Sequence, residues 1–252
     1  MNIFEENDIV KTVDMEVFGR FFTPDIKSVI QSVRKYGFDI RVVGGAVRDF
    51  ILGKQPRDVD FATDADPAEL ILIFDLEGIE YDAGGIVHGT VKGVFGDEKV
   101  DVTSITYKIE IVDGKMIATY SKGWEADARN RDLTINSLSL DMDGNIYDYV
   151  DGLSDIKNGV IRLNTSQYSK IHQDPNIIMR WFKALSYFDN PTWPKKDYEI
   201  IQNNLHLLSK IRDDSRTAKN LGNIMSHPNG AKVIRLMCGM GVSEYIDIDC
   251  SI

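Results

Sequence analysis

The chain has 252 residues, of which 43% are apolar and 10% aromatic, and this is enough to bury a core in one large domain or two small ones. The formal net charge of −10 argues against broad electrostatic capture of nucleic acid, although a bound metal ion can supply positive charge locally. The polar, acidic N-terminus is unlike a signal peptide, and no apolar run approaches the roughly 18 residues of a membrane span. We therefore expect a cytoplasmic protein with no membrane contact.

The two cysteines, Cys238 and Cys250, both lie near the C-terminus. Their spacing matches no metal-binding motif, and a single pair does not make a disulfide scaffold. We expect them to be reduced thiols.

The first half of the chain mixes helix and strand patterns, which predicts a sheet of about five strands with helices. A helix is expected between Thr23-Pro24 and Gly37, where the first pair provides a cap and the glycine a stop. The other predicted elements, in chain order, are a strand over 39–43, a helix over 46–52, a strand over 58–62, a helix from Pro67, strands over 87–95 and 99–105 with a turn at Gly96-Asp97, and two strands joined at Asp113-Gly114.

The second half is predicted to be helical, which makes the fold class α+β. From Asp174 onward, apolar residues recur at helical spacing, and 213–226 and 228–238 predict two further helices. The first helical face comprises Ile177, Ile178, Trp181, Leu185 and Phe188. We place the domain boundary near 140–150, with one domain over 1–142 and a helical domain over 143–252.

A Gly44-Gly45 turn between a strand and a helix is the first candidate functional feature. Glycines let the backbone approach a phosphate closely, and Arg48 could hold a triphosphate with its guanidinium group. The structural alternative is an ordinary turn.

The second feature is a pair of carboxylates, Asp58 and Asp60, which leave the same face of the predicted strand. Such a pair repels unless a cation lies between its members, and hard oxygen ligands favour Mg²⁺. Asp101, on a neighbouring strand, could add a third carboxylate, and three of them can hold two metal ions for phosphoryl transfer. The alternative is an edge strand with solvated acids.

In combination these motifs resemble the class II (bacterial-type) tRNA nucleotidyltransferase and poly(A) polymerase family. The resemblance is dense over residues 41–163. It is carried, in chain order, by Gly44-Gly45-Ala46-Val47-Arg48-Asp49, Leu52-Gly53, Pro56, Asp58-Val59-Asp60, Ala62-Thr63, Gly85, His88-Gly89-Thr90-Val91, Asp101-Val102-Thr103, Asp127, Arg131-Asp132-Leu133-Thr134-Ile135-Asn136-Ser137, Asp148, Gly152, Asp155, Gly159 and Ile161-Arg162.

The resemblance implies a polymerase-β-like head followed by a helical neck, and transfer of a nucleoside monophosphate from CTP or ATP to an RNA 3′-hydroxyl. It implies that Asp58 and Asp60 are metal ligands with Asp101 as third carboxylate, and that Gly44, Gly45 and Arg48 bind the triphosphate. The segment that contacts the incoming sugar and phosphates maps to Arg131, Asp132 and Asn136. The structural alternatives are an ion pair for Arg131 and Asp132 and a helix-capping amide for Asn136.

The neck motif departs from the family pattern. The family has Glu-Asp-Pro-Leu-Arg-Ile-Leu-Arg, where the Asp and the first Arg read the base, and this chain has Gln173-Asp174-Pro175-Asn176-Ile177-Ile178-Met179-Arg180. Asp174 and Arg180 are retained, but Ile177 cannot donate the hydrogen bond of the reading arginine. Arg180, three positions on, is the nearest replacement, or the enzyme is permissive. Three further positions also lack an expected arginine, namely Thr106, Asn130 and Lys183.

The resemblance also implies body and tail domains, for which residues 189–252 leave no room beyond the neck, so we expect a shortened form with weak tRNA grip. An oligomer would ease this difficulty. A modestly basic helical region could help, although an ordinary solvated face is the simpler interpretation; it comprises Arg212, Arg216, Lys219, Lys232 and Arg235.

Several functions stay open at this point. The first is CCA addition or repair at the tRNA 3′ end. Close variants are poly(A) addition and partial CCA addition, whether A-adding or CC-adding. Transfer to a protein or an antibiotic is disfavoured by the neck. A catalytically inactive nucleotide- or RNA-binding module is a hypothesis of another class, which the three retained carboxylates disfavour.

Overall fold

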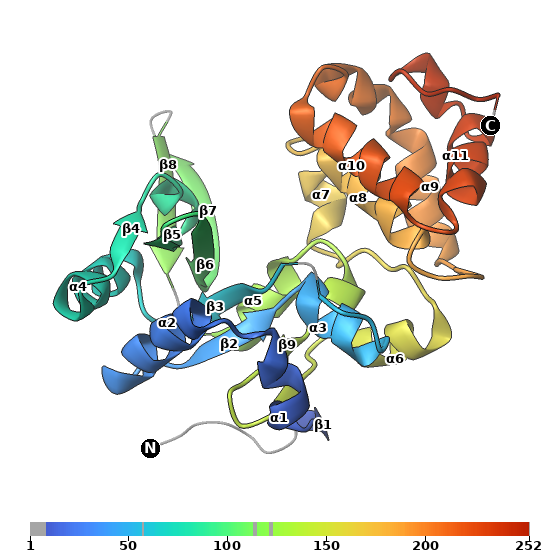
Figure 1. Cartoon of the computed structure of the whole chain (residues 1–252). Coiled ribbons are helices and arrows are strands. Elements are labelled where there is room, and N and C mark those ends of the chain that lie inside the picture. The colour runs from blue at the N-terminus through green and yellow to red at the C-terminus, as the bar shows by residue number, and fades with distance from the viewer. Residues whose placement is uncertain (1–8, 57, 113–114, 121–122, 252) are drawn as a thin grey trace. The chain divides into compact units, whose positions relative to one another are not determined.

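The computed structural model describes residues 9–56, 58–112, 115–120 and 123–251 (Figure 1). The chain forms two compact units, a first unit of Met1–Asn130 with Asn136–Leu153 and a second unit of Arg131–Ile135 with Ser154–Ile252. The predicted division after residue 142 differs from this partition. Residues 131–135 join the second unit because Leu133 bridges to Leu163 and the Thr134 N–H donates to the Arg162 carbonyl.

The first unit is built on an eight-stranded mixed sheet in the order β1-β10-β9-β2-β3-β6-β5-β4. Only β3 and β6 run parallel, and every other neighbouring pair is antiparallel. The strands are β1 (Ile9–Thr12), β2 (Ile40–Val43), β3 (Asp60–Thr63), β4 (Glu80–Asp82), β5 (Thr90–Phe95), β6 (Glu98–Ser104), β9 (Ser139–Leu140) and β10 (Asn145–Tyr147). The α+β class is confirmed, and the sheet is wider than predicted because several short strands extend it.

A separate two-stranded sheet consists of β7 (Thr106–Val112) and β8 (Lys115–Tyr120). Val112 pairs with Lys115, as a hairpin requires. The predicted turn at Asp113-Gly114 lies outside the described residues.

The helices of the first unit begin and end where local signals place them. Thr23 caps α2 by accepting from the Ile26 N–H, and Asp66 and Glu69 form a reciprocal capping box at the start of α4. Helices α2 and α4 pack against each other through buried apolar residues. The helical elements are α1 (Met15–Phe18), η2 (Gly19–Phe21), α2 (Pro24–Lys35), α3 (Gly45–Ile51), α4 (Pro67–Glu77), η3 (Ile86–His88) and α5 (Trp124–Asn130). Two further elements, η4 (Thr134–Asn136) and α6 (Gly152–Asn158), span points in the sequence where the chain changes from one unit to the other.

The second unit is helical, as predicted, and α8 lies at its centre. Four of the five residues of the predicted face, Ile177, Ile178, Trp181 and Leu185, are at most 1% exposed, and Phe188 is half-buried. Helix α8 packs against α10 and α11. The elements are α7 (Gln167–Lys170), α8 (Asn176–Leu185), α9 (Lys195–Asn203), η5 (Leu205–Ile211), α10 (Ser215–Ser226), α11 (Gly230–Gly239) and η6 (Val242–Glu244).

The expectation of two reduced thiols is wrong, because the structure joins Cys238 and Cys250 in a disulfide. The chain turns after α11 at Gly241, which has a φ of 84°, and buried Ile246 holds the returning segment in place. The two Cα atoms thereby come within 5.9 Å. The spacing of the cysteines does not by itself indicate this return of the chain.

Each helix in the described residues is too short or too polar to cross a lipid bilayer.

Candidate active site

The predicted Gly44-Gly45 turn lies where β2 meets α3. Val43, the last residue of β2, pairs with Asp60 of β3, so the turn begins beside Asp60. Gly44 adopts a φ of 74° and a ψ of −138°, a conformation that strongly favours glycine. The turn and the acidic strand are therefore adjacent in the sheet as well as near in sequence.

Arg48 folds back over this turn and is nearly buried, with a side chain that is 7% exposed. Its guanidinium group donates to Asp49 Oδ1 from Nε and Nη2 (2.9 and 2.7 Å) and to Asn136 Oδ1 from Nη1 (2.6 Å). A Cβ atom at Gly45 would lie 3.2 Å from Arg48 Nη2, so a side chain there would press on the guanidinium group. The structure thus brings together four predicted site residues, Gly44, Gly45, Arg48 and Asn136.

Asp58 and Asp60 are both exposed. Strand β3 begins at Asp60, two residues later than the predicted start at residue 58. Asp58 therefore lies just before β3 and not on it. Two exposed carboxylates with hard oxygen donors fit a divalent cation by their chemistry. Among the residues that the structure describes, no group of three or more His, Cys, Asp or Glu side chains is placed to hold a metal ion.

Asp101 lies on β6, the parallel neighbour of β3. Phe61 pairs with Val102, so the residues before them, Asp60 and Asp101, are neighbours at the same level of the sheet. Phe61 and Val102 are fully buried, which puts the two carboxylates on the opposite face. Asp101 Oδ2 accepts from Lys92 Nζ at 2.6 Å, a contact that the sequence analysis did not foresee.

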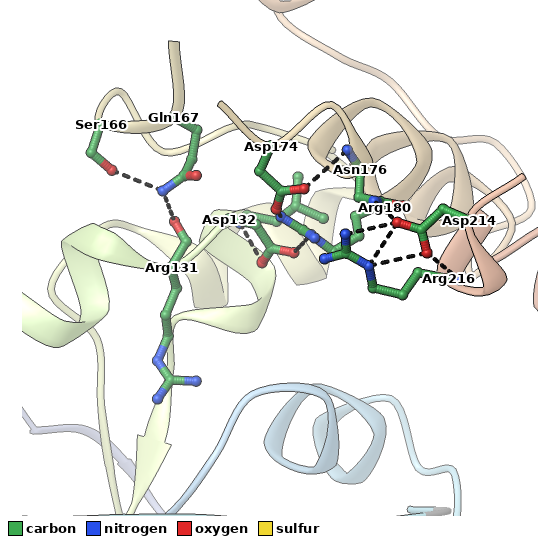
Figure 2. A network of polar contacts seen from close by, with 10 residues as sticks. Arg131, Asp132, Ser166, Gln167, Asp174, Asn176, Arg180, Asp214 and Arg216 are labelled. Atoms are coloured by element: carbon green, nitrogen blue, oxygen red, sulfur yellow. Dashed lines mark hydrogen bonds and ion pairs between the residues drawn. The ribbon is translucent and has the colours of Figure 1, made fainter. Parts of the chain in front are cut away.

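In the second unit, Arg180 joins two predicted residues from different segments (Figure 2). Its Nε lies 2.9 Å from Asp132 Oδ2, and its Nη2 lies 2.9 Å from Asp174 Oδ2. Figure 2 shows the Arg131 side chain extending away from this network, while the Arg131 carbonyl accepts from Gln167 Nε2 at 3.0 Å. The ion-pair partner of Asp132 in this network is therefore Arg180.

Ile177, at the position of the expected reading arginine, is 1% exposed and belongs to the core of the second unit. Beside it, Asn176 Nδ2 donates to Asp214 Oδ2 at 3.4 Å, and Asp214 forms an ion pair with Arg216 at 2.7 Å. The hydrogen bonds from Arg216 lower the pKa of Asp214 to about 2. Asp214 was not among the predicted site residues. The predicted helix began at residue 213, whereas α10 begins at Ser215 and Asp214 caps it by accepting from the Arg216 N–H.

Comparison with known proteins is consistent with this geometry. Residues 40–162 match the Poly A polymerase head domain family. The mitochondrial CCA tRNA nucleotidyltransferase 1 of Danio rerio is 36% identical over 231 residues, which cover 90% of this chain and 53% of the relative. The CCA-adding enzyme of Lactobacillus johnsonii is 31% identical over 220 residues, covering 86% of this chain and 54% of the relative.

Among solved structures, the CCA-adding enzyme of Bacillus stearothermophilus in complex with CTP superposes with a TM-score of 0.74 at 28% identity, covering 89% of this chain and 54% of that one. The chain spans about half the length of the curated relatives it matches. The fold is that of the polymerase-β-like head expected from the resemblance. Residues 40–162 of the chain therefore form a head domain of the Poly A polymerase family, and the chain is similar to CCA tRNA nucleotidyltransferases and CCA-adding enzymes.

Proposed function

We propose that this chain is a template-independent RNA nucleotidyltransferase, which adds CMP and AMP from CTP and ATP to the 3′ end of tRNA in CCA addition or repair. The observation that carries the proposal is the convergence of three features on the strands β2, β3 and β6. The glycine turn follows Val43, Val43 pairs with Asp60, and Asp60 is level with Asp101. Relatives named for CCA addition and a neighbour solved with CTP support the choice of reaction and nucleotide.

In this proposal Asp58 and Asp60 are the metal ligands, and Asp101 is the third carboxylate. The cofactor is Mg²⁺, because carboxylate oxygens favour a hard cation. When bound, the metal ions would polarise the attacking 3′-hydroxyl and neutralise charge on the leaving pyrophosphate. The contribution of the chain is to hold Asp60 and Asp101 on one face of rigid strands, with Asp58 two residues before Asp60.

The triphosphate is proposed to bind at Gly44, Gly45 and Arg48. Asp49 and Asn136 hold the guanidinium group of Arg48 from two sides, which fixes its orientation before substrate arrives. A preorganised cation loses little side-chain entropy on binding an anion. The absence of a side chain at Gly45 leaves room for the folded-back arginine.

Nucleotide contacts in the second unit are assigned to Arg131, Asp132, Asp174 and Arg180. Arg180 holds Asp174 and Asp132 in one network, so the carboxylate that would accept from the exocyclic amine of C or A has a fixed position. Ile177 is buried and cannot contribute a donor. Selectivity between CTP and ATP is therefore proposed to be weaker than in a chain with an arginine at this position. Poly(A) addition and partial CCA addition are the close alternatives.

The decisive experiment supplies Mg²⁺, one labelled nucleotide at a time, and tRNAs that end before, within and after CCA. Incorporation of C and then A that stops at CCA supports the proposal, whereas a ladder of A indicates poly(A) addition. Asp60→Asn should abolish incorporation, and Asp97→Asn, an exposed turn residue between β5 and β6, should not. No incorporation by the wild-type chain with intact RNA binding would indicate an inactive binding module. Light scattering in the same buffer, with and without tRNA, measures the molar mass and so shows whether the chain binds tRNA as an oligomer.

We also propose that the protein works in the cytoplasm. Disulfides are rare in that reducing compartment, so the redox state of the Cys238–Cys250 pair in cells tests this location. Rapid acid trapping of cells followed by alkylation would show two added tags if this is right. A bond that persists in freshly trapped cells would contradict the cytoplasmic location.

A further inference from the structure

One row of side chains crosses four strands on the face of the sheet that carries Asp60. Asp82 of β4 pairs with Lys92 of β5, and Lys92 pairs with Asp101 of β6. Asp101 is level with Asp60 of β3. Cross-strand partners point to the same face, so the row reads acid, base, acid, acid.

Within this row, the Lys92 ammonium group is bound to Asp101 rather than shared equally with Asp82. Lys92 Nζ donates to Asp101 Oδ2 at 2.6 Å, with both side chains about one-third exposed, at 32% and 35%. Asp82 has other partners, because Oδ1 accepts from the Gly84 N–H and Oδ2 lies 3.5 Å from Lys99 Nζ. Lys92 is thus the cation nearest to the third carboxylate.

We propose that Lys92 is a positioning residue that acts as the internal counter-ion of Asp101. A divalent cation must then compete with the Lys92 ammonium group for that carboxylate. The inference rests on the proposed function in taking Asp101 as part of the metal site. Its consequence is that the free protein binds metal weakly at this place, and that a nucleotide triphosphate, which brings negative charge, favours full loading. Lys92 would then set the order in which metal and nucleotide arrive.

The physical basis is Coulombic. A unit positive charge within about 5 Å of a divalent ion opposes its binding appreciably even at a half-exposed site, where the effective dielectric constant is high. Removing that charge while leaving Asp101 in place should tighten binding of a divalent ion by at least about tenfold. A lysine that merely buttressed the strand would have no such effect on the ion.

The test is a titration of the whole chain with Mn²⁺ in the absence of nucleotide, followed by electron paramagnetic resonance of the free ion. Lys92→Met should bind Mn²⁺ at least about tenfold more tightly than the wild-type chain. Lys92→Arg, which keeps the charge, should bind as the wild type does. Asp60→Asn should weaken binding in the Lys92→Met background, which places the ion at these strands.

Lys99→Met is the matched control, since Lys99 lies on the same hairpin and its exposed pair with Asp82 is also acid–base. The proposal is overturned if Lys92→Met binds Mn²⁺ no more tightly than wild type, or if Lys99→Met gives an equal gain. Circular dichroism checks that each variant is folded, and Lys92→Thr serves if Lys92→Met is not. The proposed function is tested separately, because it fails if the wild-type chain incorporates no nucleotide. The Mn²⁺ titration can be interpreted in either case.

Discussion

Arg48 donates a hydrogen bond to Asn136 over 2.6 Å, although 88 positions separate the two residues in sequence. The contact joins the glycine turn to a segment that the sequence analysis had assigned to the same nucleotide by resemblance alone. Asn136 is here the residue that orients an almost buried guanidinium group, together with Asp49 on the other side.

Asn136→Ala should therefore impair nucleotide binding more than turnover. The substitution removes one acceptor from a charged donor, which is typically worth about 1.5–3 kcal/mol, so KM for CTP should rise by about tenfold or more. Asn136→Asp keeps an acceptor and should retain a KM nearer to that of the wild type. Steady-state kinetics of incorporation measure both, and an unchanged KM in Asn136→Ala would exclude this role.

The Arg180 network gives a prediction for the second unit. Arg180→Ala leaves Asp132 and Asp174 without their shared cation, and the loss should cost about 2 kcal/mol of unfolding free energy and alter the ratio of C to A incorporation. The matched control is Arg129→Ala. Arg129 and its partner Glu125 are about equally exposed, so the loss of unfolding free energy should be less than about 0.5 kcal/mol. Urea unfolding measures the loss of stability, and paired incorporation assays measure the ratio of C to A. Equal effects of the two variants on both quantities would contradict the role of Arg180 in nucleotide contact.

Asp197 gives a prediction about pH. Its side chain is fully buried and accepts from the Leu163 N–H at 2.7 Å and from the Tyr168 hydroxyl at 2.8 Å. Burial raises the pKa of Asp197 above its usual value of 3.8. The folded state therefore holds this proton more tightly than the unfolded state does.

The resulting contribution to stability is present below pH 3.8 and is lost as the pH rises through the raised pKa. Asp197→Asn removes the titration but keeps an acceptor for Leu163. We therefore subtract the unfolding free energy of Asp197→Asn from that of the wild type. This difference should fall as the pH rises from about 4 to 7. Denaturant unfolding at several pH values measures it, and a difference that rises with pH would show that the sign is wrong. Asp197→Ala, which leaves two donors unpaired, should cost about 2–4 kcal/mol at pH 7.

The Cys238–Cys250 disulfide should stabilise the second unit. Closing a loop with a sequence separation of 12 restricts the unfolded chain and is worth about 3 kcal/mol in the chain-entropy treatment. The double variant Cys238→Ser/Cys250→Ser should therefore unfold at lower urea concentration than the oxidised chain and at the same concentration as the reduced one. Identical midpoints for oxidised and reduced wild type would refute a stabilising role.

Much of the local structure follows from the sequence because short-range signals specify it. Thr23 before Pro24, and Asp66 three residues before Glu69, place helix starts that the structure reproduces. The Gly96-Asp97 turn even fixes the pairing of Lys92 with Asp101, since Phe95 opposes Glu98 and the register then follows along the hairpin. That contact was within reach of the sequence, had the register been followed outward from the turn.

Motif order likewise determined the family and the fold class, whereas long-range packing decided the partners within the site. The chain had to fold before Arg48 met Asn136, Arg180 met both Asp132 and Asp174, or Asp60 came level with Asp101. Neither spacing nor composition shows that the chain returns after Gly241 to close the disulfide. The physical reason is that helix caps and hairpin registers depend on a few neighbouring residues, while these contacts depend on how buried surfaces from distant segments fit together.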